Sequence, residues 1–400
     1  MIYADNASTT KISESVLAKM LPFLQEQYGN ASNQYSFGIK VKRAIEQSRR
    51  QVAEAIGAES SEIVFTSGGS EGNSWVFQGV AALYDKQPIH IITSSIEHPS
   101  VLNTCRALEK RGVSVTYLPV DNDGRISVFD VEATLRPETK LVSIMFANNE
   151  IGTIQSIAGI GSLLKEHNIL FHTDAVQAVG HIHVNVVNLQ VDFLTASAHK
   201  FNGAKGTGFI YVKSGLRLPQ IVFGGEQEHG TRAGTENVAG IVALGHALAE
   251  NVAMMSNEEE KKNALVEETI AGLRAGIPGI KFNGGYAEQL PGVLNVTFPN
   301  ASGEAMMHLL DLKGICVSTG SACYSGKDEP SHVLLAIGLT EQQAKSSIRI
   351  SYGRYNTGED AKEIILAVCE AYEKIAAALT PTPVNRLPAG ETAAWKSAPR

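Results

Sequence analysis

The feature that most constrains this chain is an alternation of short apolar runs with stretches whose apolar residues recur at helical spacing. The apolar runs lie at 62–66, 90–94, 113–120, 141–147, 169–174, 191–195 and 208–212. Alternating strands and helices predict an α/β domain on a mostly parallel sheet with helices on both faces. Polar clusters follow several of these runs, and ligands of such sheets bind beyond the carboxyl ends of the strands. We therefore expect the functional site at that edge.

The second half of the chain has a different composition. Two long helices are predicted at 236–255 and 258–273, followed by short strands, Gly-rich turns and a last helix at 360–379. Four hundred residues exceed one ordinary core. We expect a large domain over 13–257 and a smaller α+β domain made of 1–12 and 258–379. Residues 380–400 have no apolar period, which predicts a disordered tail.

Charge and composition exclude several classes of function. The net charge is −7 and no dense Lys/Arg block occurs, which argues against a direct nucleic-acid partner. No apolar run is long enough for a membrane span, and the N-terminus lacks the plan of a signal peptide, so we expect a cytoplasmic protein. The four cysteines form no C-x-x-C pair, and no metal site is expected.

A lysine and an aspartate stand at the ends of two predicted strands. Lys200 follows the apolar run 191–195, and a desolvated amine there can form a Schiff base with pyridoxal phosphate. The alternative is an exposed lysine in a Gly-rich turn. Asp174 ends the run 169–174 and could pair with a protonated pyridine nitrogen or cap a helix. Their spacing allows them to lie on adjacent strand ends that face one pocket.

Three further features fit such a pocket. The Gly-rich turn 67–73 enters a helix, and its backbone N–H groups suit a phosphate, with Ser70 adding a hydroxyl. His98 follows another strand and could stack on a flat ring, although a lone histidine in a loop is more often a surface group. Cys323 lies among small residues that allow a mobile loop, where a thiol could attack a substrate; the alternative is a free cysteine in a turn.

Ordered motifs along nearly the whole chain, about residues 1–379, resemble the aminotransferase class V enzymes, and within them the NifS/IscS-type cysteine desulfurases. The motifs are YADNASTT at 3–10, TSGGSEGN at 66–73, EH at 97–98, NNEIG at 148–152, HTDAVQ at 172–177, SAHK at 197–200, RAGTEN at 232–237, STGSAC at 318–323 and SIRIS at 347–351. The resemblance implies the type I aminotransferase fold dependent on pyridoxal 5′-phosphate, with a mainly parallel seven-stranded sheet in the large domain. It also implies a homodimer with sites at its interface.

The resemblance implies roles for individual residues. Catalysis would involve Lys200, His98 and Cys323. The cofactor would be held by Lys200, Asp174, Gln177, His98, Gly69, Ser70, Ser197, His199 and, from a second subunit, Thr235. The substrate would meet Asn149, Arg349 and Asn30. The chain departs from the family at Ala31 and Tyr35, where Pro and His are usual, and at Ser70, where Thr is usual.

The implied activity is conversion of L-cysteine to L-alanine, with the sulfur held as a persulfide on Cys323. A sulfur-acceptor protein would then take it, such as an iron–sulfur scaffold or a tRNA-thiolation enzyme. The alternatives are a selenocysteine lyase or another class V aminotransferase, and a non-catalytic assembly protein that keeps the fold. A thiol on a small-residue loop disfavours a plain aminotransferase, which needs none.

Overall fold

The computed structural model describes residues 1–285, 288–319 and 329–379. A seven-stranded sheet dominates it, in the order β2-β8-β7-β6-β5-β3-β4. Only β8 runs opposite to its neighbours. The strands are β2 (Ile63–Thr66), β3 (His90–Ser94), β4 (Ser114–Leu118), β5 (Thr139–Ser143), β6 (Leu170–Asp174), β7 (Phe193–Ser197) and β8 (Gly208–Val212). The predicted α/β class and mainly parallel sheet are confirmed.

Successive residues of the central strands point into two separate apolar cores. Ile91 and Phe193 belong to the core on one face, whereas their chain neighbours Ile92 and Leu194 belong to the core on the other. Because side chains alternate along a strand, a sheet covered on both faces needs nearly continuous apolar runs. The covering helices and turns are α1 (Glu14–Gln25), α2 (Ser36–Ile56), η1 (Ser60–Glu62), α3 (Gly69–Leu83), α4 (Pro99–Glu109), α5 (Val128–Thr134), α6 (Ile157–Glu166), α7 (Val186–Leu189), η2 (Ala198–Lys200), α8 (Gln227–Gly230) and α9 (Val238–Gly276).

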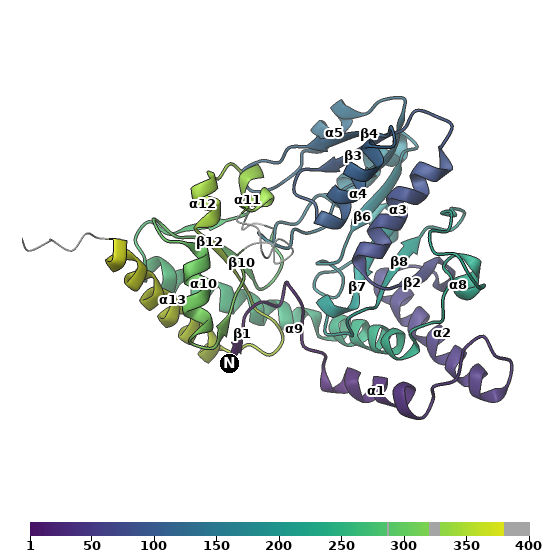
Figure 1. Cartoon of the computed structure of the whole chain (residues 1–400), viewed down its shortest axis with the longest axis horizontal. Coiled ribbons are helices and arrows are strands. Elements are labelled where there is room, and N and C mark those ends of the chain that lie inside the picture. Colours follow the sequence, from purple (N-terminus) through teal and green to yellow (C-terminus); the bar gives the residue numbers. More distant parts are fainter. Residues whose placement is uncertain (286–287, 320–328, 380–400) are drawn as a thin grey trace, which may run out of the picture.

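The C-terminal part has a core of its own, which includes Ile2 and Ala4 from the N-terminus. A three-stranded sheet in the order β12-β10-β9 and the parallel pair β1-β11 build it together with helices. Figure 1 shows β10, β12, α10 and α13 gathered away from the large sheet. The elements are β1 (Ile2–Tyr3), β9 (Lys281–Asn283), β10 (Val293–Thr297), α10 (Gly303–Asp311), β11 (Ile315–Cys316), α11 (His332–Ala336), α12 (Glu341–Lys345), β12 (Ser347–Ser351) and α13 (Gly358–Leu379).

One long helix, α9, joins the two cores, so the prediction of two helices at 236–255 and 258–273 is wrong. Its first half packs in the core of the large sheet through Leu244 and Leu248, and its second half packs in the other core through Leu265. No Gly or Pro interrupts the polar stretch between the halves, so the backbone continues as helix. By length and composition α9 could cross a membrane, but half of its apolar window is buried inside the protein. We assign it to the core.

Candidate active site

A cavity of about 280 Å³ lies at the carboxyl edge of the parallel strands. Ten of the predicted site residues line it, and they come from segments far apart in the sequence. These are Gly69, Ser70, His98, Asn149, Asp174, Gln177, Ser197, His199, Lys200 and Arg349. Among these predicted residues the cavity brings together the amine of Lys200, the buried carboxylate of Asp174 and the guanidinium of Arg349.

Lys200 and Asp174 reach the cavity from neighbouring strands. Asp174 is the last residue of β6 and pairs in register with Thr195 of β7. Strand β7 runs on to Ser197, two residues beyond the predicted end, and the short turn η2 then carries Lys200. The prediction that the two residues follow adjacent strands is confirmed.

The Asp174 carboxylate is buried and held by neutral donors. The side-chain amide of Asn73 donates to Oδ2 at 2.6 Å, and the backbone N–H of Val176 donates to Oδ1 at 3.0 Å. The second bond is the local turn contact that the capping alternative anticipated. No ion pair joins Asp174 to a described side chain. A buried carboxylate without a cation favours a ligand that brings one.

His98 is the N-cap of α4, and its ring is oriented by the residue two positions on. The backbone N–H of Ser100 donates to Nδ1 at 3.1 Å, so Nδ1 is the unprotonated nitrogen of the neutral ring. Burial lowers the pKa of His98, although the Asp174 carboxylate opposes that shift. The ring is therefore neutral near pH 7 and carries its proton on Nε2.

The N-terminal turn, which was predicted only as irregular chain, forms one wall of the cavity. The Lys200 amine donates to the backbone carbonyls of Ala7 at 2.8 Å and Ser8 at 2.7 Å. The Gln177 amide also donates to the Ala7 carbonyl, at 2.9 Å. His199 contacts the Thr9 hydroxyl at 3.1 Å. The contacts to Ala7 and Ser8 are made to backbone carbonyls, and only the motif at 3–10 gave a sign of them.

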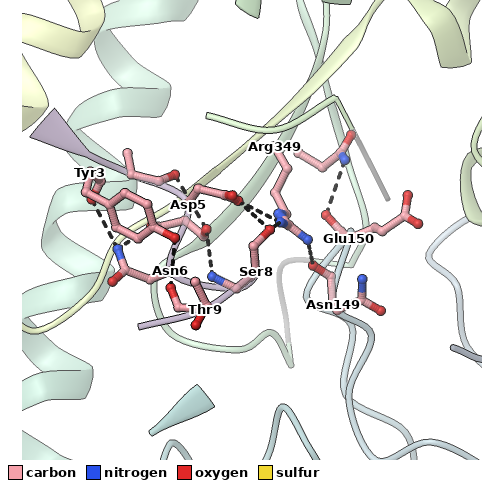
Figure 2. A network of polar contacts seen from close by, with 12 residues as sticks. Tyr3, Asp5, Asn6, Ser8, Thr9, Asn149, Glu150 and Arg349 are labelled. Atoms are coloured by element: carbon pink, nitrogen blue, oxygen red, sulfur yellow. Dashed lines mark hydrogen bonds and ion pairs between the residues drawn. The ribbon is translucent and has the colours of Figure 1, made fainter. Parts of the chain in front are cut away.

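Arg349, on β12, brings a guanidinium from the second core to the same wall (Figure 2). Its Nη2 donates to Asp5 Oδ1 and to Ser8 Oγ, both at 2.7 Å, and its Nη1 donates to the Asn149 carbonyl at 2.7 Å. The side chain is 2 % exposed. Its buried Nε has no acceptor among the described residues. A buried guanidinium with an uncommitted donor suits an anionic ligand.

Another part of the cavity lining suits a phosphate. Helix α3 starts at Gly69 with no side chain capping it, which leaves its first N–H groups to a ligand. A Cβ on Gly69 would lie 2.7 Å from Val176 Cγ2, so the backbone there fits only glycine. Ser70, Ser197 and His199 line the same cavity. Burial, with the nearby Lys200 charge, lowers the pKa of His199 to about 4, so its ring acts as a neutral donor or acceptor.

Three predicted residues are not brought to this cavity by the described chain. Asn30 is exposed in the loop before α2, where its side chain accepts from the backbone of Ser32. Thr235 is exposed and borders a separate hollow. Cys323 lies outside the described residues.

Sequence reasoning missed several residues of the cavity. Asn73 donates to both Asp174 and Ser100, and the Ser100 hydroxyl contacts His98 Nδ1 at 2.8 Å, which links the carboxylate to the imidazole. Glu97 and His332 also line the cavity, and His332 Nε2 lies 3.0 Å from the Glu97 carbonyl. Asn73 and Glu97 stood inside quoted motifs without a role. Nothing marked His332.

The chain is similar to known proteins along nearly its whole length. The model of the aminotransferase class-V family matches residues 2–364. Cysteine desulfurase IscS of Clostridium botulinum is 48% identical over 366 residues, covering 91% of this chain and 92% of that protein. Cysteine desulfurase IscS of Methanosarcina thermophila is 46% identical over 374 residues, covering 94% and 92%.

Solved structures show the same similarity. A NifS-like protein superposes with a TM-score of 0.88 at 36% identity, covering 93% of this chain and 99% of that one. SspA in complex with cysteine superposes with a TM-score of 0.80 at 37% identity, covering 89% and 100%.

Proposed function

The chain belongs to the aminotransferase class V family, and on that basis we propose that it is a pyridoxal-phosphate-dependent cysteine desulfurase that converts L-cysteine to L-alanine. The observation that carries the proposal is the meeting of Lys200, Asp174, His98 and Arg349 in one cavity. Each side chain supplies a different function. Lys200 supplies an amine and Asp174 a carboxylate, His98 can carry a proton, and Arg349 is a cation that can bind a carboxylate. The curated IscS relatives and the neighbour with cysteine support the same substrate.

The residues of the cavity fit pyridoxal phosphate. Lys200 would hold its aldehyde carbon, Asp174 its ring nitrogen and Gln177 its ring hydroxyl, with His98 against the ring. Gly69, Ser70, Ser197 and His199 would hold its phosphate. When bound, this group supplies an electron sink that stabilises negative charge at the substrate Cα. Thr235 is exposed away from this cavity, and we assign it to the cavity of a second copy in a homodimer.

Other side chains position the substrate and move protons. Arg349 holds the substrate carboxylate, with Asn149 beside it. The Lys200 amine takes the Cα proton of the substrate. His98 is neutral and carries its proton on Nε2, and it moves a proton to or from the substrate. Burial of Arg349 keeps water away from the clamp.

Sulfur transfer needs no external oxidant or reductant. The Cys323 thiolate attacks the substrate sulfur, an S–S bond forms, and the Cβ–S bond breaks with its electron pair going to carbon. Two protons complete alanine, and Cys323 keeps the persulfide. We propose a cytoplasmic protein that passes this sulfur to an acceptor protein, for iron–sulfur cluster assembly or tRNA thiolation.

Two variants test the proposal. Cys323→Ala should stop sulfide release from cysteine and leave the yellow colour of bound pyridoxal phosphate unchanged. Lys200→Ala should remove that colour. Intact-mass measurement of the full chain after incubation with cysteine should show one added sulfur atom on Cys323. Absence of that mass, in protein that binds the cofactor, would contradict desulfuration, and amino transfer to a keto acid would point to a class V aminotransferase.

A further inference from the structure

The guanidinium of Arg349 already holds a carboxylate of the protein itself. Asp5 Oδ1 accepts from Nη2 at 2.7 Å, and the Ser8 hydroxyl accepts from the same nitrogen at 2.7 Å. The Ser8 hydroxyl in turn donates to Asp5 Oδ1 at 2.9 Å. Figure 2 shows Asp5 and Ser8 together on one side of the guanidinium and Asn149 on the other.

This arrangement leaves no open two-donor edge for a second carboxylate. A guanidinium offers a carboxylate two edges, Nη1 with Nη2 and Nη2 with Nε, because the third edge is covered by its own Cδ. Both edges need a hydrogen of Nη2, and both of those hydrogens are committed to Asp5 and Ser8. The uncommitted Nε–H alone gives a single contact. A substrate carboxylate therefore has to displace one of the present acceptors to bind with two hydrogen bonds.

The same turn also holds the amine of the cavity. The Ser8 carbonyl accepts from the Lys200 amine at 2.7 Å, and the Ala7 carbonyl accepts from it at 2.8 Å. Ser8 thus contacts Arg349 through its side chain and Lys200 through its backbone. Asp5 is 18 % exposed, so its carboxylate can move toward water without being desolvated further. Asp5 belongs to the same short turn as Ala7 and Ser8, whose carbonyls hold the Lys200 amine.

We propose that Asp5 is an internal occupant of the carboxylate clamp, which the substrate carboxylate replaces on binding, and that this exchange loosens the turn that holds the Lys200 amine. The inference rests on the proposed role of Arg349 as the clamp. The exchange is neutral at the guanidinium, because one carboxylate leaves as another arrives. Asp5 acts through Arg349 and is a positioning residue. It lowers the affinity of the clamp for every carboxylate by the same factor.

The test uses propionate, a carboxylate without an amine, on the full chain loaded with pyridoxal phosphate. A ligand that binds only the folded protein raises the melting temperature by mass action. Asp5→Asn should bind propionate about tenfold more tightly than the unchanged protein, as judged from that rise. Potassium chloride at equal ionic strength serves as the salt control. The gain should vanish in the double variant Asp5→Asn, Arg349→Met.

Equal or weaker propionate binding by Asp5→Asn would overturn the proposal, because Asp5 would then only orient the guanidinium. Should Asp5→Asn not fold, Ser8→Ala replaces it: one Nη2 hydrogen becomes available, and a gain of about threefold is expected. An unchanged affinity in that variant would count against the exchange. Propionate binding requires no turnover. A failure to form the persulfide on Cys323 would therefore contradict the proposed function without changing the propionate affinities.

Discussion

Two buried arginine–carboxylate pairs in this molecule differ in what they leave unpaired. Arg49 on α2 donates through Nη1 and Nη2 to both oxygens of Glu228, through Nη1 also to the Ile63 carbonyl, and through Nε to Glu46. Every nitrogen of that guanidinium has an acceptor. Arg349 is equally buried, but its Nε has no acceptor among the described residues and it lines the cavity. The first pair is complete in itself, whereas the second keeps one uncommitted donor beside the cavity.

The difference shows how to separate a structural ion pair from a binding one. Desolvating two charges costs several kcal/mol, and a buried pair recovers that only when its other donors and acceptors are also satisfied. The Arg49–Glu228 pair meets this condition, since the backbone N–H of Phe65 also donates to Glu228 at 2.8 Å. The Arg349–Asp5 pair does not, and an uncommitted donor beside a cavity marks the pair that functions in binding.

Breaking the complete pair should have the largest effect on stability. Glu228→Gln leaves the Arg49 charge buried without a counter-charge, and the expected loss of unfolding free energy is about 3 kcal/mol. Urea unfolding followed by circular dichroism measures it. The cysteine KM of the folded variant should change less than about twofold. A loss below about 1 kcal/mol would show that the two pairs do not differ in the way described.

Matched lysine substitutions should separate the two arginines by function. Arg349→Lys keeps the charge but loses the planar fork, so kcat/KM for cysteine should fall by about 100-fold, on the order of 2.7 kcal/mol. Arg49→Lys should leave kcat/KM within about threefold and lower the unfolding free energy instead. Alanine formation and urea unfolding on both variants give the two readouts. Equal losses of kcat/KM in both variants would contradict the assignment of Arg349 to binding and of Arg49 to stability.

Among the described residues, Glu97 is a carboxyl group that no cation pairs with, and it extends the comparison. Glu97 is fully buried, its Oε1 accepts from Ser94 Oγ at 2.7 Å and from the Met145 N–H at 2.8 Å, and its Oε2 has no partner among the described residues. Burial, with the nearby Asp174 charge, raises the pKa of Glu97 from 4.5 to about 8. The folded protein therefore binds this proton more strongly than the unfolded chain, and stability falls as pH rises from about 4.5 to 8.

Glu97→Gln removes that dependence with a neutral side chain of the same shape. At pH 8 the variant should be more stable than the unchanged protein by a few kcal/mol, and near pH 4.5 the two should be nearly equal. Urea unfolding at intervals from pH 5 to 8 checks the slope. Parallel curves across that range would mean that Glu97 is ionised in the folded state.

The sheet and the neighbouring positions of Asp174 and Lys200 could be predicted from the sequence, because they depend on the spacing of apolar residues and on chain order. Seven apolar runs predicted the sheet, and the spacing of Asp174 and Lys200 predicted neighbouring strand ends. Two helices were predicted, with a break between Met255 and Glu258, yet no Gly or Pro stands in this charged stretch, and α9 continues to Gly276. Charge marks solvent exposure, whereas only Gly, Pro or a cap marks an end.

The contacts that the N-terminal turn makes in the cavity were harder to predict, because several of them are made by backbone atoms. Carbonyls of Ala7 and Ser8 hold Lys200, and any residue type carries a carbonyl. The partner of Arg349 lies 344 positions away at Asp5, a distance over which local pattern carries no information. The roles of the site residues, and that of Cys323 outside the described chain, stay predictions until the variants above are made.

The smallest expected effect concerns the orientation of the Asp174 carboxylate. Asp174 contrasts with the carboxylates of the two arginine pairs, because its described partners are neutral. The Asn73 amide at 2.6 Å fixes its orientation and also reaches the Ser100 hydroxyl at 2.9 Å. Asn73→Ala should therefore leave the carboxylate in place but less well oriented, and weaken pyridoxal phosphate binding about tenfold, which is about 1.4 kcal/mol. Absorbance titration of the cofactor-free protein measures the affinity.

The neighbouring change Ser74→Ala is the matched control, because Ser74 also bonds from α3 to α4, at 3.2 Å to Thr104, without touching Asp174. It should leave the affinity within about twofold. If both variants weaken binding equally, the amide acts by holding the two helices together. If only Asn73→Ala weakens binding, neutral donors orient the Asp174 carboxylate for a cation that the ligand brings. Arg349 is then the opposite case, a cation with an uncommitted donor for a ligand's negative charge.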